Sequence, residues 1–226
     1  TVAPEASLRI VSLSPTATEM LYAIGAGDQV VAVDSYSTFP EETASKVTKL
    51  SAFEPSVEAI LAYEPDVVLI SNDMNKITEQ LESISSRKIT VWTGAAAASI
   101  DDVYKQINEL GELTGRSSEA SALVADMTKR IDAVVPDVAP TDASSVYYEL
   151  DNTYYSVTSN TFVGALLKQF GMVSIADGVE EGNDYPQLSA EAIVKADPSI
   201  IFLADTKCCQ QSAATVKARA GWSGIS

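Results

Sequence analysis

Two glutamates occupy matching places in two copies of one motif. Residues 56–70 read Ser-Val-Glu-Ala-Ile-Leu-Ala-Tyr-Glu-Pro-Asp-Val-Val-Leu-Ile, and residues 189–203 read Ser-Ala-Glu-Ala-Ile-Val-Lys-Ala-Asp-Pro-Ser-Ile-Ile-Phe-Leu. The serine that opens each copy is a good helix N-cap. Glu58 and Glu191 then fall at the second helical position, where a carboxylate suits the positive end of the helix dipole. Because a capping box needs its acid one residue later, both carboxylates are expected to point outward.

Cys208 and Cys209, the two cysteines of the chain, are adjacent in sequence. Adjacent residues do not reach the usual Cα separation of a disulfide without distorting the backbone. The pattern leaves open two reduced thiols or a strained vicinal disulfide, and it disfavours a metal site, since two sulfurs alone do not complete a tetrahedral set. Histidine is absent, so we predict no metal site, no conventional catalytic triad and no catalytic residues.

Aromatic residues gather in segments that follow predicted strands. In parallel α/β sheets, ligands bind beyond the carboxyl ends of the strands, in pockets that are mostly apolar. Of the fixed cations, only Lys207 lies in a loop that we expect to face the ligand, so we expect a neutral or cationic ligand. The candidate ligand-binding residues are Tyr36, Phe53, Tyr154, Tyr155, Tyr185, Ser14 and Asn72.

The elements that must position these residues alternate between strand and helix, which predicts parallel sheets with right-handed crossovers. Expected strands lie at 9–13, 30–33, 67–70, 89–92, 146–150, 173–176 and 200–203, and expected helices at 17–24, after Ser56, at 75–84, 100–114 and 117–135, before Gly171 and after Ser189. Pro65 and Pro198 should end the two motif helices. The runs 67–70 and 200–203 are typical of strands buried on both faces.

The repeat predicts two similar lobes. We assign an N-terminal α/β lobe to residues 1–115, a connecting helix and linker to 116–140, and a C-terminal lobe to 141–226, with no further strand after 206. The amphipathic segment 117–135 has no second copy, so we interpret it as the connection between the lobes.

Composition narrows the class of function. The chain has 226 residues and a formal net charge of −16, which disfavours nucleic acid and anionic membrane surfaces as partners. No apolar run approaches the ~20 residues that span a bilayer. The polar start at residues 1–7 fits a segment that follows a removed signal peptide.

Enzyme signatures are weak. Gly25-Ala26-Gly27 follows a helix and precedes a strand, the reverse of the order in a dinucleotide-binding fingerprint. A two-lobed α/β hydrolase acting through carboxylates stays open as the alternative, because acids are plentiful although no arrangement singles out a pair. We therefore expect a binding protein rather than an enzyme.

Several segments together resemble one family. They are Ile10-Val11-Ser12-Leu13-Ser14-Pro15 with Glu19, Tyr36-Ser37-Thr38-Phe39-Pro40, Ser56-Val57-Glu58-Ala59-Ile60 through Glu64-Pro65-Asp66, and Tyr185-Pro186-Gln187-Leu188-Ser189 with Glu191. The family is the class III substrate-binding proteins of ABC importers for iron–siderophores, haem and vitamin B12. The likeness covers nearly the whole chain and is greatest to the vitamin B12-binding members.

The resemblance implies two Rossmann-like lobes joined by a single long helix, 117–135. It implies a metal chelate, a ferric siderophore or a corrinoid, held in the cleft between the lobes by aromatic residues at Tyr36, Phe53 and Tyr185, with no intrinsic cofactor. It also implies that Glu58 and Glu191 dock onto arginines of the membrane permease. The protein is then a monomer in the periplasm or a lipoprotein at the outer face of the cell membrane.

The sequence departs from the family pattern in two places. Tryptophan is common where Phe53 and Tyr185 stand. Members usually finish with another strand and a long helix beyond the segment that resembles Gly221-Trp222, so we expect the second lobe to be incomplete. Manganese- and zinc-binding relatives use histidine ligands and are disfavoured.

Overall fold

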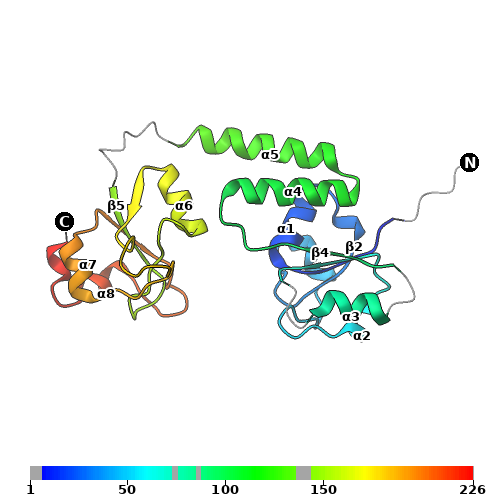
Figure 1. Ribbon diagram of the computed structural model, residues 1–226, viewed down its shortest axis with the longest axis horizontal. Helices are drawn as coiled ribbons and strands as arrows, with labels where there is room; N and C mark the ends of the chain where they lie inside the picture. The colour runs from blue at the N-terminus through cyan, green and yellow to red at the C-terminus, as the bar shows by residue number, and fades with distance from the viewer. Residues whose placement is uncertain (1–6, 73–75, 85–87, 136–143, 226) are drawn as a thin grey trace, which may run out of the picture. The chain divides into compact units, whose positions relative to one another are not determined.

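The computed structural model describes residues 7–72, 76–84, 88–135 and 144–225, which form two parallel sheets with helices (Figure 1). The strands are β1 (Ile10–Leu13), β2 (Val30–Val33), β3 (Val67–Ile70), β4 (Thr90–Thr93), β5 (Ser144–Glu149), β6 (Met172–Ser174) and β7 (Ile200–Leu203). The helices are α1 (Pro15–Ala23), α2 (Val57–Leu61), α3 (Ile77–Ile84), α4 (Ile100–Thr114), α5 (Ser117–Asp132), α6 (Phe162–Gln169), α7 (Ala190–Ala196) and α8 (Ala213–Lys217), with 3₁₀ turns η1 (Gly27–Gln29), η2 (Glu41–Ser45) and η5 (Trp222–Gly224).

The predicted order of strands and helices is therefore confirmed. Bounds differ by a few residues: α5 ends at Asp132 rather than Val135. The predicted start of the third helix at Asn75 and the linker segment 136–143 lie outside the described residues. The described residues form two compact units, one within residues 1–96 and 103–130 and the other within 97–102 and 131–226. The interpretation of 117–135 as the sole connection between lobes stays a prediction.

In the first unit the strand order is β2-β1-β3-β4 and every pairing is parallel. Neighbouring residues of β1 alternate between two apolar clusters: Ile10 packs with α1, α4 and α5 residues, and Val11 packs with α2 and α3 residues. Figure 1 shows these two helix sets on opposite faces of the sheet. The sheet is thus sandwiched between helices, as continuous apolar strands require.

The first helix begins and ends at residues that the sequence marks. Ser14 caps α1 by accepting a hydrogen bond from the backbone N–H of Ala17 (3.3 Å), and Pro15 occupies the first helical position. Ile24 is the C-cap, and Gly25 follows with a φ of +74°. A left-handed residue at this place suits glycine, which has no Cβ to clash, and this prediction is confirmed.

The two motif copies fold alike. Ser56 and Ser189 each accept a hydrogen bond from the backbone N–H three residues later, at 3.3 Å and 3.1 Å, which confirms both N-caps. The residues before the two prolines, Glu64 and Asp197, both have a left-handed backbone, with φ of 48° and 44°. Helix α2 ends at Leu61, well before Pro65, whereas α7 runs to Ala196, directly before Asp197 and Pro198.

The second unit has a smaller sheet, ordered β6-β5-β7, with parallel pairing throughout. Its buried cluster lies against α7 and α8 and includes Tyr147, Ile193, Val216 and Trp222. In the part of the chain that the structure describes, no strand follows β7, as predicted.

The prediction that both motif strands are buried on both faces is wrong for β7. All of β3 is buried, whereas every residue of β7 is only half-buried. The reason is position, since β3 lies between β1 and β4 but β7 is an edge strand that pairs with β5 alone. A groove of about 420 Å³ runs beside β7, lined by apolar residues that include Ile201, Leu203 and Val216.

Candidate functional site

At the carboxyl edge of the first sheet, the segment between β2 and α2 presents two aromatic rings. Tyr36 and Phe53 meet edge to face, with ring centroids 5.9 Å apart and an interplanar angle of 89°. Their side chains are 64% and 62% exposed. Rings that would gain from burial are instead left at the surface, where they can contact an apolar ligand.

Buried hydrogen bonds hold the Tyr36 loop in place. The Asp34 side chain is fully buried, and its Oδ1 accepts from the backbone N–H groups of Tyr36 (3.2 Å) and Ser37 (2.8 Å). Beneath them the Thr18 hydroxyl contacts those of Ser12 (2.8 Å) and Ser37 (3.2 Å). The exposed ring of Tyr36 therefore stands on a rigid base.

The other candidates of the first unit lie in different settings. Ser14 is buried and its hydroxyl is engaged in capping α1, so it is placed to shape the edge rather than to present a free side chain. Asn72 is exposed, two residues beyond the end of β3. Phe39, although 64% exposed, lines a separate groove of about 300 Å³ with Met20 of α1 and Met127 of α5.

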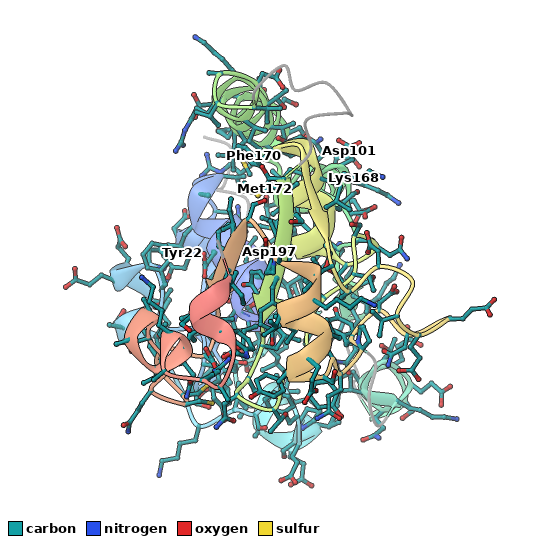
Figure 2. All side chains as sticks on the ribbon, turned by 90° about the vertical axis from the view of Figure 1, so that its left-hand side faces the viewer. Tyr22, Asp101, Lys168, Phe170, Met172 and Asp197 are labelled. Atoms are coloured by element: carbon teal, nitrogen blue, oxygen red, sulfur yellow. The ribbon has the colours of Figure 1, made fainter. Side chains whose placement is uncertain are left out.

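The carboxyl edge of the second sheet carries the three candidate tyrosines on two loops that are bonded together. Tyr155 pairs with Gln187 in an isolated β-bridge, and the N–H of Leu188 donates to the carbonyl of Tyr154 (3.0 Å). Asp184 accepts from the hydroxyl of Thr158 at 2.8 Å. Tyr155 is 40% exposed and Tyr185 55% exposed. Phe170 and Met172, labelled in Figure 2, mark the opposite, amino edge of this sheet, where α6 passes into β6.

Tyr154 differs from its two neighbours because it packs inward. Its ring stacks on that of Trp222 at 5.8 Å, and the Arg219 guanidinium lies 5.3 Å from the Tyr154 centroid and 4.6 Å from that of Trp222. Its backbone is left-handed, with a φ of 72°. Such contacts stabilise a desolvated cation, so Tyr154 supports the edge as well as lining it.

Arg219 forms a two-pronged ion pair with Glu149, the last residue of β5. Its Nη1 and Nη2 donate to Oε2 and Oε1 of Glu149 at 2.5 Å and 2.6 Å, and Nη2 also donates to Gln211 at 2.8 Å. Glu149 is fully buried and the Arg219 side chain is 14% exposed. Both charged groups are satisfied, as buried charges must be, and the hydrogen bonds to Glu149 raise the pKa of Arg219 further.

A second carboxyl group, Asp205, lies against this pair. Asp205 is fully buried, and its two carboxyl oxygens accept no hydrogen bond from the described residues. Burial and the neighbouring Glu149 raise the pKa of Asp205. A protonated Asp205 satisfies the geometry, because it donates to Glu149 instead of accepting. Burial, followed by Glu149, also raises the pKa of Tyr147 beyond its usual range.

The Glu149–Asp205 pair is the arrangement of acids that a carboxylate hydrolase would need. The structure brings these two side chains together, but each is 0% exposed. A glycosidase must hold its carboxyl groups on either side of a bound substrate. Both are instead fully buried, and Glu149 is held by Arg219, so they stabilise this edge rather than face a substrate.

Sequence reasoning missed Arg219, Glu149 and Asp205. Lys207 is exposed in the loop where it was expected, but Arg219 lies in a tail without strand character, so no periodicity pointed to it. The available signal was a spacing in the sequence. Arg219 is three residues before Trp222, and an arginine close to a tryptophan favours a cation–π contact.

The twin glutamates stand as expected. Glu58 and Glu191 occupy the second position of α2 and α7, and both side chains are exposed. Their equivalent places, one in each unit, follow directly from the repeated motif.

Two further properties concern the described residues as a whole. None of their helices combines the length and apolar character of a membrane span. They also hold no group of three or more His, Cys, Asp or Glu side chains suited to a metal ion.

Comparison with known proteins decides the family. The family model described as "Periplasmic binding protein" matches residues 10–226. The chain belongs to this family. The predicted resemblance is thereby confirmed. A "Cobalamin-binding protein" of Halobacterium salinarum (strain R1) is 37% identical over 198 residues, which are 85% of this chain and 53% of the relative.

A further relative and a solved structure agree in sequence and fold. An "Uncharacterized ABC transporter substrate-binding lipoprotein YvrC" of Bacillus subtilis (strain 168) is 32% identical over 223 residues, 96% of this chain and 68% of the relative. A crystal structure of a possible iron-binding (periplasmic solute-binding) protein from Staphylococcus epidermidis aligns with a TM-score of 0.79 at 26% identity, covering 96% of this chain and 84% of that one. The α/β fold with parallel sheets is confirmed. The chain spans about half the length of the Halobacterium relative.

Proposed function

We propose that this periplasmic binding protein is the extracytoplasmic receptor of an ABC importer and captures a corrinoid. A ferric siderophore is the second candidate. The observation that carries the proposal is the exposure of Tyr36, Phe53 and Tyr185 at the carboxyl edges of their sheets. Family membership and the 37% identity to a cobalamin-binding protein support the choice of ligand.

The chemistry of the edges suits a large conjugated chelate. Burying exposed aromatic faces against a flat ligand lowers the free energy of the complex. The one Arg side chain at the second edge is neutralised by Glu149, so it offers no free charge for a strongly anionic guest. Lys207 is exposed in the loop after β7 but offers a single charge and no arginine fork, so a neutral or cationic chelate is preferred over a strongly anionic one.

Titration of the protein with cyanocobalamin, a ferric hydroxamate and haemin, followed by intrinsic fluorescence, tests the ligand. We expect saturable quenching by cyanocobalamin at the lowest concentration. Tyr36→Ala, Phe53→Ala and Tyr185→Ala should each weaken that binding by roughly tenfold, which corresponds to about 1.4 kcal/mol. Phe170→Ala, at the amino edge of the second sheet, is the matched control and should leave the dissociation constant unchanged.

Two results would reject this assignment. If no chelate in the panel quenches a folded protein, the proposed ligand class is wrong. If Phe170→Ala weakens binding as much as the edge variants do, the carboxyl-edge aromatics are not the binding residues.

We further propose that Glu58 and Glu191 contact basic residues of the permease. Each is exposed at the start of a helix in its own unit, and the two carboxylates would pair with arginine side chains. Glu58→Arg combined with Glu191→Arg should abolish uptake in cells while leaving chelate affinity unchanged. Glu82→Arg with Glu180→Arg reverses exposed charges, one in each unit, and should leave uptake intact. Loss of chelate affinity in the first double variant would place these acids in the ligand site instead.

A further inference from the structure

Cys208 and Cys209 lie at the carboxyl edge of the second sheet, in residues 204–212 that connect β7 to α8. Cys208 is exposed and Cys209 half-buried. Their Sγ atoms are 2.6 Å apart. Both sulfurs therefore face the same side of the loop, and small reagents can reach them.

The loop holds the two sulfurs together from both ends. The N–H of Cys209 donates to the carbonyl of Asp205 (3.0 Å), and the Cys208 thiol lies 3.7 Å from the same oxygen. On the other side Gln211 donates to the carbonyl of Cys209 (3.1 Å), and Gln210 between them has a φ of +56°. Because Asp205 is itself buried, the pair is anchored to the core of the unit.

The surroundings favour thiol chemistry over metal binding. No set of three metal-ligating side chains occurs within the described ranges, which disfavours a metal site. Two sulfurs held side by side favour oxidation to a disulfide instead. The hydrogen bond with Cys208, followed by burial, raises the pKa of Cys209 to about 11. Because disulfide exchange needs a thiolate, this raised pKa slows the attack of Cys209 at neutral pH and calls for mildly alkaline conditions.

We propose that Cys208 and Cys209 form a thiol–disulfide site that closes to a vicinal disulfide when it meets a low-molecular-weight disulfide. One cysteine thiolate attacks a sulfur of the reagent, which breaks the reagent's S–S bond and releases one thiol. The second cysteine thiolate attacks the mixed disulfide at the protein sulfur, forming the Sγ–Sγ bond and releasing a second thiol. Two protein thiols are oxidised and one reagent disulfide is reduced to two thiols.

Closure should be reversible. Consecutive Cα atoms are only ~3.8 Å apart, below the usual range for a disulfide, and such strain makes the bond more reducible. Strained, exposed disulfides are the labile and regulatory ones. The site also lies near the Asp151 carboxylate, on the loop that carries Tyr154 and Tyr155.

Intact mass spectrometry after incubation with glutathione disulfide at mildly alkaline pH tests the proposal. We expect a monomer that has lost the mass of two hydrogen atoms, with no reactive thiol left and with the change confined to the tryptic peptide 208–217. Dithiothreitol should restore the original mass. Cys208→Ser and Cys209→Ser, which cannot close the ring, should each instead carry one glutathionyl group.

Three results would overturn the proposal: a wild-type protein that keeps both thiols, one that carries glutathionyl groups on both cysteines, or a disulfide-linked dimer. Each of these outcomes is measured on the protein without any chelate. Failure here therefore leaves the proposed ligand-binding function standing, and failure of the chelate titration leaves this site standing.

Discussion

The two units bury their sheets in different ways. The first has an apolar cluster on each face, built from β1, β3 and the helices on both sides. The second has one smaller cluster, an edge strand that is half exposed, and a buried group of charged side chains at its carboxyl edge. An apolar core tolerates substitutions that conserve volume, whereas removing one partner of a buried ion pair is strongly destabilising. The ion pairs described in the first unit are exposed, so we expect the loss of one charged partner to be far more destabilising in the second unit.

The same contrast appears in the candidate ligand residues. In the first unit Tyr36 and Phe53 contact each other and are mostly exposed, above a base of neutral hydroxyls and one carboxylate. In the second unit Tyr154 is held by Arg219 and Trp222. The first edge thus offers two exposed rings that contact each other, whereas the second offers the exposed Tyr155 and Tyr185 beside a half-buried Tyr154 that a charge network fixes.

Removing Arg219 should have the largest effect on stability. Arg219→Met leaves Glu149 buried without its cation, which should lower the free energy of unfolding by about 3–5 kcal/mol. Arg116→Met breaks the exposed Arg116–Glu119 pair of the first unit and should cost at most about 1 kcal/mol. The chain has one tryptophan in each unit, Trp92 and Trp222. Urea unfolding in a Trp92→Phe background therefore reports the second unit through Trp222, and a Trp222→Phe background reports the first.

A double variant separates the pair from its neighbours. Glu149→Gln combined with Arg219→Met removes both charges and should recover part of the loss, because no uncompensated charge remains. If Arg219→Met costs no more than Arg116→Met, the two units do not differ in the way described above.

Asp205 should make the second unit less stable as the pH rises. Its pKa is raised in the folded state, so the folded protein binds a proton that the unfolded chain releases above a pKa of about 3.9. The contribution is complete below that value and is lost as pH rises toward the folded-state pKa. Asp205→Asn keeps a donor toward Glu149 and cannot ionise, so it should be more stable than wild type at neutral pH and equal to it in acid.

Trp222 fluorescence in urea, measured from pH 4 to pH 8 in the Trp92→Phe background, follows this difference. Asp132→Asn changes an exposed carboxylate and should show no such gap between variant and wild type. A gap for Asp205→Asn that stays constant across the pH range would mean that Asp205 does not titrate differently on folding.

Local signals in the sequence predicted most of the fold. Gly25, Ser56 and Ser189 act through their nearest neighbours, so these three helix ends followed from residue type. Apolar runs gave the strands for the same reason. The burial of β7 was predicted wrongly, because the edge position of a strand depends on which strands pair with it. The residues 200–203 alone do not indicate that pairing.

The candidate site residues also divide into those that local signals predicted and those that they did not. Glu58, Glu191 and the aromatic candidates were predicted from motif repetition and loop position, and the structure shows all of them exposed except Tyr154, which is half-buried. The Glu149–Arg219 pair joins residues 70 positions apart, and nothing local links the two partners, since the spacing of Arg219 from Trp222 indicates only a contact with that ring. Ser14 was selected for its place after a strand, although its hydroxyl turned out to cap α1.

The smallest expected effects compare the two motif copies directly. Ser56→Ala and Ser189→Ala each remove one N-cap and should each lower the free energy of unfolding of their own unit by about 1 kcal/mol. Ser56→Asp and Ser189→Asp, which keep an acceptor at the cap, should restore most of it. Trp92 reports the first loss and Trp222 the second. Equal losses would show that the copies match in energy as well as in geometry. A loss confined to Ser189→Ala would show instead that the two apolar faces of the first sheet hold α2 in place without its cap, whereas α7, packed on the smaller cluster, depends on it.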